Sequence, residues 1–283
     1  MNHTETRYLE SKRSLDNRAR SLRVRDRLLS ALGPDPRIVD LGCGTGTIVS
    51  KLLEWGIDAG TYRGIDNDCG VVEFGRAVRP AEFRRAGYTV TEQECGFTVE
   101  NLSVTYDTGD AMTMLEDMDG IDLLVAQAFA DLVPVSTLLS RVESALTPGG
   151  LAYLPITFDA GTIFQPDHPA DRAVEQAYHA AIDLEPGRDV QAGRHLADAC
   201  RRRAGDLLAM AGSDWVLRPD GDTYPADEAY FLASILGFVE TVLVDSEVAE
   251  AEDWIETRRE QLAAGELTYV AHQYDLLYQT SQS

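Results

Sequence analysis

The sequence predicts an α/β protein: a mostly parallel sheet of seven strands with helices on both faces and a helical lid. Short apolar runs rich in β-branched residues alternate with segments of helical spacing as far as about residue 157. The first of these runs leads directly into a glycine-rich turn that opens a helix. Beyond residue 157 the helical segments become long, acidic and aromatic, which predicts a part that covers the sheet.

Residues 4–32 are expected to form one long helix ahead of the sheet. Large apolar residues recur along it every seven positions: Tyr8, Leu15, Leu22 and Leu29. Arg18 falls on the same face, and a buried arginine needs an anion as its partner. That anion is either an internal carboxylate, such as Asp16 or Asp40, or a ligand.

Residues 37–49 predict a buried strand, a glycine turn and the start of a helix. Gly42, Gly44 and Gly46 let a ligand approach the backbone, because glycine has no Cβ and adopts positive φ at little cost. The helix that follows points unpaired N–H groups at the same place. Thr47 stands where the third glycine of a dinucleotide motif would be. The pattern therefore favours a nucleoside ligand over nicotinamide or flavin.

The remaining elements follow the same alternation. Strands are expected at residues 61–66, 104–106, 121–127, 151–157, 213–217 and 267–277. Helices are expected at residues 48–55, 69–85, 135–146, 171–184, 194–211, 227–244 and 248–264, with an interruption of the second near Pro80. Residues 87–101 form either a hairpin or an irregular insertion.

Three parts follow from these elements. Residues 1–33 form an N-terminal helix that covers the active site, and residues 34–157 form the core that binds a cofactor. Residues 158–283 hold the lid and the last strands, because segments 158–190 and 219–265 exceed ordinary connections.

The residues Val39-Asp-Leu-Gly-Cys-Gly-Thr-Gly46 resemble motif I of the class I S-adenosylmethionine-dependent methyltransferases. Thr147-Pro-Gly-Gly150 matches the turn that leads into this family's fifth strand. The resemblance extends over roughly residues 37–157 and implies a Rossmann-like core that binds S-adenosyl-L-methionine. It implies that the motif residues hold the methionine part of the cofactor: Asp40, Gly42, Cys43, Gly44 and Gly46.

Two acidic residues are candidates for contacts with the nucleoside. Asp66 ends the second strand 20 residues after Gly46, where a carboxylate accepts both ribose hydroxyls, and Asn67 stands beside it. The other interpretation of Asp66 is the N-cap of the next helix. The resemblance implies that Asp110, with Ala111, contacts the adenine amino group; the alternative is an Asx-type turn.

Further candidates lie outside these motifs. Gln127 ends the fourth strand and Asp131 follows it, at the edge where such sheets meet the substrate, and Gln127 is expected to contact the cofactor. In many class I methyltransferases a helix before motif I closes over the cofactor. This resemblance makes Tyr8, Lys12 and Arg18 candidates for contacts with the cofactor carboxylate or an acidic substrate.

Methyl transfer requires an aligned nucleophile, exclusion of water and, for a neutral O–H or N–H acceptor, a base. The candidate bases are His168, His179 and Asp131, with Tyr8, Tyr153 and Trp215 as walls. A surface or capping role is the other interpretation of His168. No metal is expected, because no His, Asp and Glu residues have the spacing of a ligand set.

The charge argues against polyanionic partners. The chain has 47 Asp and Glu against 25 Lys and Arg, and its net charge of −22 repels nucleic acid and anionic membranes. It also lacks the Asn/Asp-Pro-Pro-aromatic signature of enzymes that methylate the exocyclic amines of bases. Only two basic residues are lysines, which with the acidic excess resembles halophilic proteins; a GC-rich genome is the alternative explanation for the scarce lysines.

The sequence predicts a cytoplasmic protein. It has no run of 18 apolar residues and no apolar N-terminal signal segment. Its four cysteines form no C-x-x-C pair, so neither a disulfide framework nor a thiolate zinc site is expected. The sequence leaves open whether the chain forms a homodimer.

The leading hypothesis is a methyltransferase that acts on an O, N or C nucleophile of a small molecule. A non-catalytic S-adenosylmethionine-binding or sensor protein is the alternative, and an oxidoreductase with a nucleotide cofactor is a third hypothesis. All three place a nucleoside at the same edge of the sheet.

Overall fold

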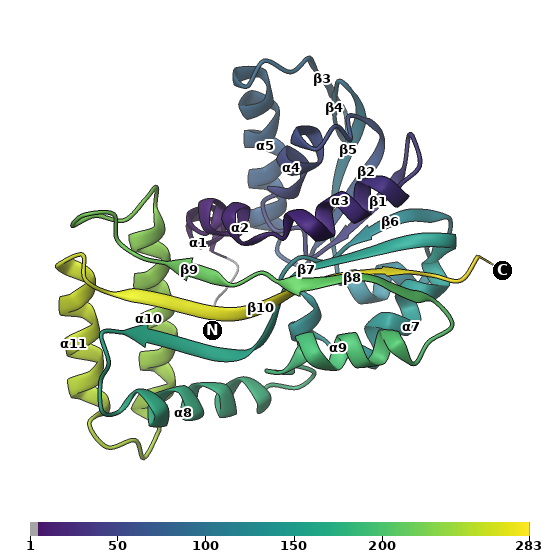
Figure 1. The fold of residues 1–283 in the computed structure, drawn as a ribbon. Helices are drawn as coiled ribbons and strands as arrows, with labels where there is room; N and C mark the ends of the chain where they lie inside the picture. Colours follow the sequence, from purple (N-terminus) through teal and green to yellow (C-terminus); the bar gives the residue numbers. More distant parts are fainter. Residues whose placement is uncertain (1–4, 283) are drawn as a thin grey trace.

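The computed structural model describes residues 5–282, which form a ten-stranded sheet with helices around it (Figure 1). The strands are β1 (Arg37–Leu41), β2 (Ala59–Asp66), β3 (Val90–Gln93), β4 (Gly96–Val99), β5 (Asn101–Thr108), β6 (Ile121–Val125), β7 (Leu146–Gln165), β8 (Asp206–Gly212), β9 (Trp215–Leu217) and β10 (Thr268–Gln279). The helices are α1 (Thr6–Ser11), α2 (Arg13–Ala19), α3 (Leu22–Ala31), α4 (Ile48–Glu54), α5 (Cys69–Arg85), α6 (Ala111–Glu116), the 3₁₀ turn η1 (Ala130–Leu132), α7 (Val135–Ala145), α8 (Asp171–Asp183), α9 (Ala192–Arg201), α10 (Glu228–Val244) and α11 (Ala251–Ala263).

The centre of the sheet is parallel. Its order is β3-β4-β5-β2-β1-β6-β7-β10-β8, and the strands from β5 to β7 all run in one direction. Chain order reverses between β1 and β6, so the carboxyl ends of these two strands flank the crevice where open α/β sheets bind ligands. The mostly parallel α/β core is thus confirmed.

Two hydrophobic layers hold the core helices on the sheet. On one face α3, α4 and α5 bury apolar side chains: Val24, Leu28, Val49, Leu52 and Phe83. On the other face α6, α7 and α9 do the same: Leu115, Leu138, Val142, Leu196 and Cys200. The parallel strands are buried on both faces, which explains why they read as continuous apolar runs in the sequence.

β7 and β10 extend far beyond the core as an antiparallel ribbon. Their pairing runs from Leu151 opposite Gln279 to Gln165 opposite Thr268, and Figure 1 shows the far end of this ribbon below the parallel strands, among α8, α10 and α11. A third hydrophobic cluster lies here, and Trp254, Phe231 and Leu232 are fully buried in it. The expected fifth strand, residues 151–157, is therefore only the middle of a much longer one.

The N-terminal segment is three helices, where the sequence predicts one. The chain turns at Lys12, and at Arg20 it becomes extended before Ser21 caps α3 by accepting a hydrogen bond from the Val24 amide. Serine favours this capping position because its hydroxyl binds a free helix N–H group. The break changes the helical phase, so Arg20 is buried and Arg18 is exposed. Thr4, the predicted start of the helix, lies outside the described residues.

Three further predictions about the elements are corrected. The sheet has ten strands in place of seven, because residues 87–101 contain the hairpin β3–β4 and because β8 adds a strand next to β10. Residues 206–211 belong to β8 and not to a helix, since pairing with β10 overrides their helical composition. α5 continues unbroken through Pro80. None of the helices within residues 5–282 is both long and apolar enough to cross a membrane.

Candidate ligand-binding site

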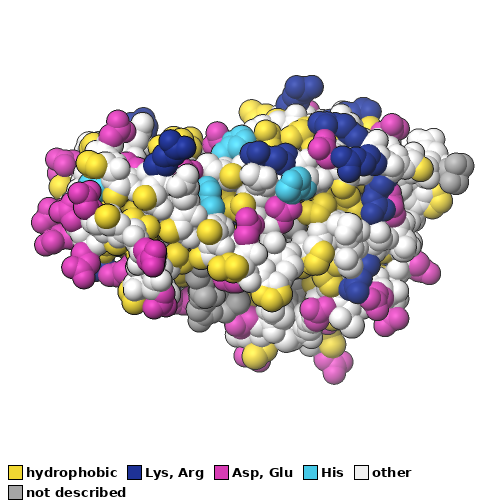
Figure 2. All heavy atoms as spheres, turned by 90° about the horizontal axis from the view of Figure 1, so that it is seen from below, with side chains coloured by type: hydrophobic (Ala, Val, Ile, Leu, Met, Phe, Trp, Pro, Cys, Tyr) yellow, Lys and Arg dark blue, Asp and Glu magenta, His cyan; other side chains and the backbone are white. Residues whose placement is uncertain are grey.

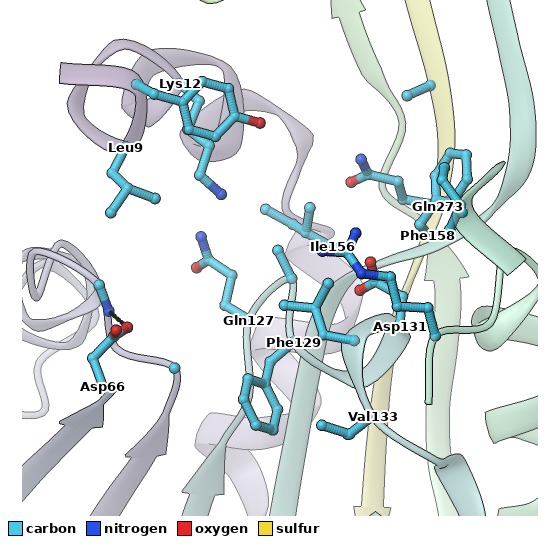
Figure 3. Close-up of a pocket in the computed structure, with 18 of the residues that line it drawn as sticks. Leu9, Lys12, Asp66, Gln127, Phe129, Asp131, Val133, Ile156, Phe158 and Gln273 are labelled. Atoms are coloured by element: carbon cyan, nitrogen blue, oxygen red, sulfur yellow. Dashed lines mark hydrogen bonds between the residues drawn. The ribbon is translucent and has the colours of Figure 1, made fainter. Parts of the chain in front are cut away.

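A cavity of about 540 Å³ lies at the carboxyl edge of the parallel strands, between this edge and the ribbon of β7 and β10. Figure 3 shows Asp66 on one side, Asp131, Phe158 and Gln273 on the other, and Gln127 between them. The predicted residues that line it are Tyr8, Lys12, Gly42, Gly44, Asp66, Asn67, Asp110, Ala111, Gln127, Asp131 and Trp215. The cavity thus brings together most of the predicted nucleoside contacts and one of the three candidate bases.

The glycine turn after β1 forms one wall. Gly42, Gly44 and Gly46 all have positive φ, of 66°, 52° and 75°, which side chains with a Cβ rarely adopt. A Cβ on Gly44 would point toward Leu9 of α1 at 3.3 Å, on the cavity side of the turn. A Cβ on Gly46 would collide with the Tyr106 hydroxyl, so this glycine packs the turn onto β5.

Asp66 holds the same turn from the end of β2. Its Oδ2 accepts the Gly44 N–H at 2.8 Å (Figure 3), and its Oδ1 accepts the Asp68 N–H at 3.0 Å. The N-cap of α5 is Asp68, whose carboxylate accepts the N–H groups of Gly70 and Val71. The alternative interpretation of Asp66 as this N-cap is therefore wrong. Asp66 remains half-buried, with its carboxylate facing the cavity, and Asn67 is exposed beside it.

Asp40 and Cys43 do not line the cavity. Asp40 is buried beneath the turn and accepts a hydrogen bond of 2.6 Å from the Tyr62 hydroxyl. Burial raises the pKa of Asp40 to about 7. The Cys43 side chain lies inward, against the position that a Cβ on Gly64 would take, and burial raises the pKa of its thiol. Both residues support the turn from below.

Asp110 both lines the cavity and caps a helix. It lines the cavity beside Ala111, and its Oδ1 accepts the Thr113 N–H at 2.6 Å as the N-cap of α6. This hydrogen bond lowers the pKa of Asp110. Its other carboxylate oxygen has no hydrogen bond in the described residues and is available to a ligand.

Gln127 connects the cavity to the N-terminal helices. Its amide donates to Oδ2 of the buried Asp16 at 2.9 Å and accepts from the Arg20 guanidinium. The indole N–H of Trp215 donates to the other oxygen of Asp16 at 2.9 Å. The polar network therefore holds α2, β9 and the end of β6 together at the cavity.

Asp131 lies on η1 and faces the cavity. Its Oδ1 is closed to solvent and has no hydrogen-bond partner among the described residues. Burial raises the pKa of Asp131 to about 6, although its own backbone amide, Arg188 and Lys12 favour the charged form. Such a carboxyl is able to accept a proton near neutral pH.

Arg18 and the two candidate histidines lie away from the cavity wall. Arg18 forms an ion pair with Glu228 at the start of α10, so its anion is a carboxylate that the sequence did not suggest. The Ala170 N–H donates to Nδ1 of His168 at 3.1 Å, and Nε2 lies 3.1 Å from Asp253, which agrees with the capping interpretation. His179 contacts Thr162 at 2.9 Å from behind the wall, and burial lowers its pKa.

The other half of the cavity wall comes from residues that the sequence analysis did not select. They lie on β7, α8, β10 and α10 and in the segment after α8: Ile156, Phe158, Thr162, Tyr178, Ile182, Arg188, Ile235, Tyr269, Ala271 and Gln273. No local motif marks them, because they come together only through the long pairing of β7 with β10. The alternating apolar residues of these strands are the one sequence signal that could have identified them.

No protein-family model and no curated protein matches the chain. Solved structures with a similar fold include a SAM-dependent methyltransferase from Thiobacillus denitrificans in complex with S-adenosyl-L-homocysteine (19% identity, 92% of each chain covered, TM-score 0.48). A putative sarcosine dimethylglycine methyltransferase from Galdieria sulphuraria is 17% identical, with 92% of this chain and 86% of that chain covered and a TM-score of 0.45. A geranyl diphosphate C-methyltransferase from Streptomyces coelicolor A3(2) is 16% identical, with 90% and 77% covered and a TM-score of 0.45. Similarity at this level describes a fold and does not assign an activity.

Proposed function

We propose that this chain is an S-adenosyl-L-methionine-dependent methyltransferase that acts on a small molecule. The observation that carries the proposal is the bond between the Gly44 N–H and Asp66, which joins a glycine turn after β1 to a carboxylate at the end of β2. Both face a cavity at the switch point of a parallel sheet, where α/β proteins bind nucleosides. The volume of about 540 Å³ is in the usual range for small-molecule sites.

The residues present fit this cofactor. The carboxylates of Asp66 and Asp110 stand at the ends of neighbouring parallel strands and supply acceptors for ribose hydroxyls and an exocyclic amine. The turn at Gly44 leaves space that a Cβ would fill, and Lys12, which pairs with Asp16 at 3.5 Å, adds a positive charge to the cavity wall. When bound, the cofactor supplies an electrophilic methyl group on sulfur.

The protein's own contribution is position, exclusion of water and a proton acceptor. α1 and the turn that follows it contribute Tyr8, Leu9 and Lys12 to the cavity, so we propose that residues 1–33 cover the site over a cofactor core of residues 34–157. Residues 158–283, which include the ribbon with α8 and α10, then form the acceptor pocket and its lid. Asp131 is the proposed base, because it is the one candidate base that lines the cavity.

The acidic surface motivates a second proposal, which concerns the protein's surroundings and the partners that it excludes. Figure 2 shows Asp and Glu side chains gathered at the end formed by α11, which contains Glu252, Asp253, Glu256 and Glu260. With the net charge of −22, this surface favours a protein of a salt-rich cytoplasm that binds neither nucleic acid nor membranes.

Calorimetry with S-adenosyl-L-homocysteine and with NAD, followed by a methyl-transfer assay, tests the function. We expect S-adenosyl-L-homocysteine to bind with a dissociation constant on the order of micromolar and NAD not to bind. A mass shift of one methyl group on an added O, N or C nucleophile would complete the test. Binding of NAD alone would refute the proposal, and tight cofactor binding with no transfer to any nucleophile would favour a sensor.

A further inference from the structure

The acceptor half of the cavity contains the carboxylate of Asp131, which forms no ion pair within the described residues. Within residues 5–282 no Lys, Arg or His nitrogen lies within 4 Å of the Asp131 carboxylate, and its Oδ1 is enclosed without a hydrogen bond. Enclosing an unpaired carboxylate costs folding free energy, so such groups persist where a ligand compensates them. The compensating ligand must bring hydrogen-bond donors, a positive charge or both.

The two cations in the cavity wall do not serve Asp131, because each has a carboxylate of its own. Lys12 lies 3.5 Å from Asp16 and also stands over the Trp215 ring, 5.4 Å from its centre. Arg188 is 2.6 Å from Glu185, on the same segment after α8. Both cations lower the pKa of Asp131 only at a distance.

The surroundings of Asp131 are aromatic. Rings from four different elements line the same cavity: Tyr8, Phe158, Tyr178 and Tyr269. The faces of such rings attract cations, and their effect is larger in a site that excludes water. Gln273 adds a buried amide whose Oε1 has no partner among the described residues, and Figure 3 shows it beside Phe158 on the side of Asp131.

We propose that the methyl acceptor is a small amine, which Asp131 binds through its N–H groups between these aromatic walls. This inference rests on the proposed methyltransferase function. An amine binds as an ammonium ion with several N–H donors, so it brings the charged Asp131 carboxylate both a counterion and hydrogen bonds. A carboxylate or phosphate acceptor would be repelled, and an alcohol would leave the charge of Asp131 without a counterion.

The methyl transfer involves only the amine, the cofactor and the Asp131 carboxylate. The nitrogen lone pair forms the new N–CH₃ bond while the C–S bond breaks and leaves its electron pair on sulfur. Because an ammonium group has no free lone pair, the bound amine gives one N–H proton to a carboxylate oxygen of Asp131 before the methyl group is transferred. No oxidant, reductant or metal takes part.

Binding of matched probes tests the inference apart from catalysis. 2-Phenylethylamine, 2-phenylethanol and 3-phenylpropanoate, together with a set of shorter aliphatic amines and their alcohols, are titrated into the full chain with and without S-adenosyl-L-homocysteine. At pH 7.5 we expect at least one amine to bind at least tenfold more tightly than its matched alcohol, and the acid to bind more weakly than both. Equal or tighter binding of the alcohols across the set would overturn the inference.

The variant Asp131→Asn keeps the shape of the side chain and removes its charge. We expect it to lose the preference for the amine while its affinity for S-adenosyl-L-homocysteine changes less than twofold. Asp167→Asn is the matched control, because Asp167 is exposed and does not line the cavity. An Asp131→Asn variant that keeps the full preference would overturn the inference, and failure of S-adenosyl-L-homocysteine to bind while the amine preference remains would refute only the cofactor assignment.

Discussion

The two halves of the cavity are built in different ways. The half at the ends of β1, β2 and β5 is polar and is formed by short local segments, such as the glycine turn with Asp66. The half on β7, α8 and β10 is largely apolar, and its residues lie up to about a hundred positions apart in the chain. In the proposed function the first half binds the cofactor, which has a fixed structure, and the second half binds the acceptor.

The substitution Gly46→Ala, in the polar half, should have the largest effect on cofactor binding. Gly46→Ala forces a Cβ into the Tyr106 hydroxyl at a φ of 75°, so we expect affinity for S-adenosyl-L-homocysteine to fall by about 100-fold and the free energy of unfolding by about 2–4 kcal/mol. Calorimetry and denaturant melts measure both. Gly237→Ala in α10, where a Cβ meets no atom within 4 Å, is the control and should be neutral or stabilising. Unchanged cofactor affinity in Gly46→Ala would contradict the assignment of the turn.

The second prediction concerns the apolar half alone. Phe158→Ala removes an aromatic wall, so affinity for 2-phenylethylamine should fall about tenfold while affinity for S-adenosyl-L-homocysteine stays within twofold. Leu184→Ala, at a position that is 83% exposed, serves as the control. Equal losses for both ligands would mean that the halves are not separate.

The effect of pH should differ between the two halves, because Asp131 lies in the apolar half. Because burial raises the pKa of Asp131 to about 6, amine affinity should fall about tenfold between pH 7 and pH 5. The folded pKa exceeds the ordinary 3.8, so this carboxyl costs stability above pH 6 and costs nothing below about pH 4. Asp131→Asn should therefore raise the free energy of unfolding by about 1–2 kcal/mol at pH 7.5, with the gain disappearing toward pH 4. A gain that is independent of pH would exclude the buried charge as its cause.

The smallest expected effect belongs to Arg18. Its ion pair with Glu228 lies outside the cavity, so Arg18→Ala should change affinity for S-adenosyl-L-homocysteine less than twofold. The variant should lose about 1–2 kcal/mol of stability, because Glu228 is fully buried and keeps only the hydrogen bond from Ser14. A tenfold loss of cofactor affinity would restore Arg18 as a ligand contact.

The sequence predicts the polar half well and the apolar half poorly, for physical reasons. Strand, glycine turn and acidic strand end are encoded within 30 residues, so the positions of Gly44 and Asp66 follow from local pattern. Phe158 and Gln273 meet only because β7 and β10 pair over a long ribbon, which no local period reveals. A single helix across Ser21 predicts that Arg18, and not Arg20, lies on the buried face. In the structure the chain is extended at Ser21, which caps α3, and Arg20 is the buried arginine.

Calorimetric titration of S-adenosyl-L-homocysteine into the wild-type chain, Asp66→Ala and Asp58→Ala tests whether the glycine turn and Asp66 bind the cofactor. Asp58 is exposed just before β2, at the opposite end of this strand from Asp66. We expect S-adenosyl-L-homocysteine to bind the wild type and Asp58→Ala with similar affinity, and to bind Asp66→Ala at least tenfold more weakly. Equal affinity of all three proteins, or no binding to any of them, would contradict this expectation.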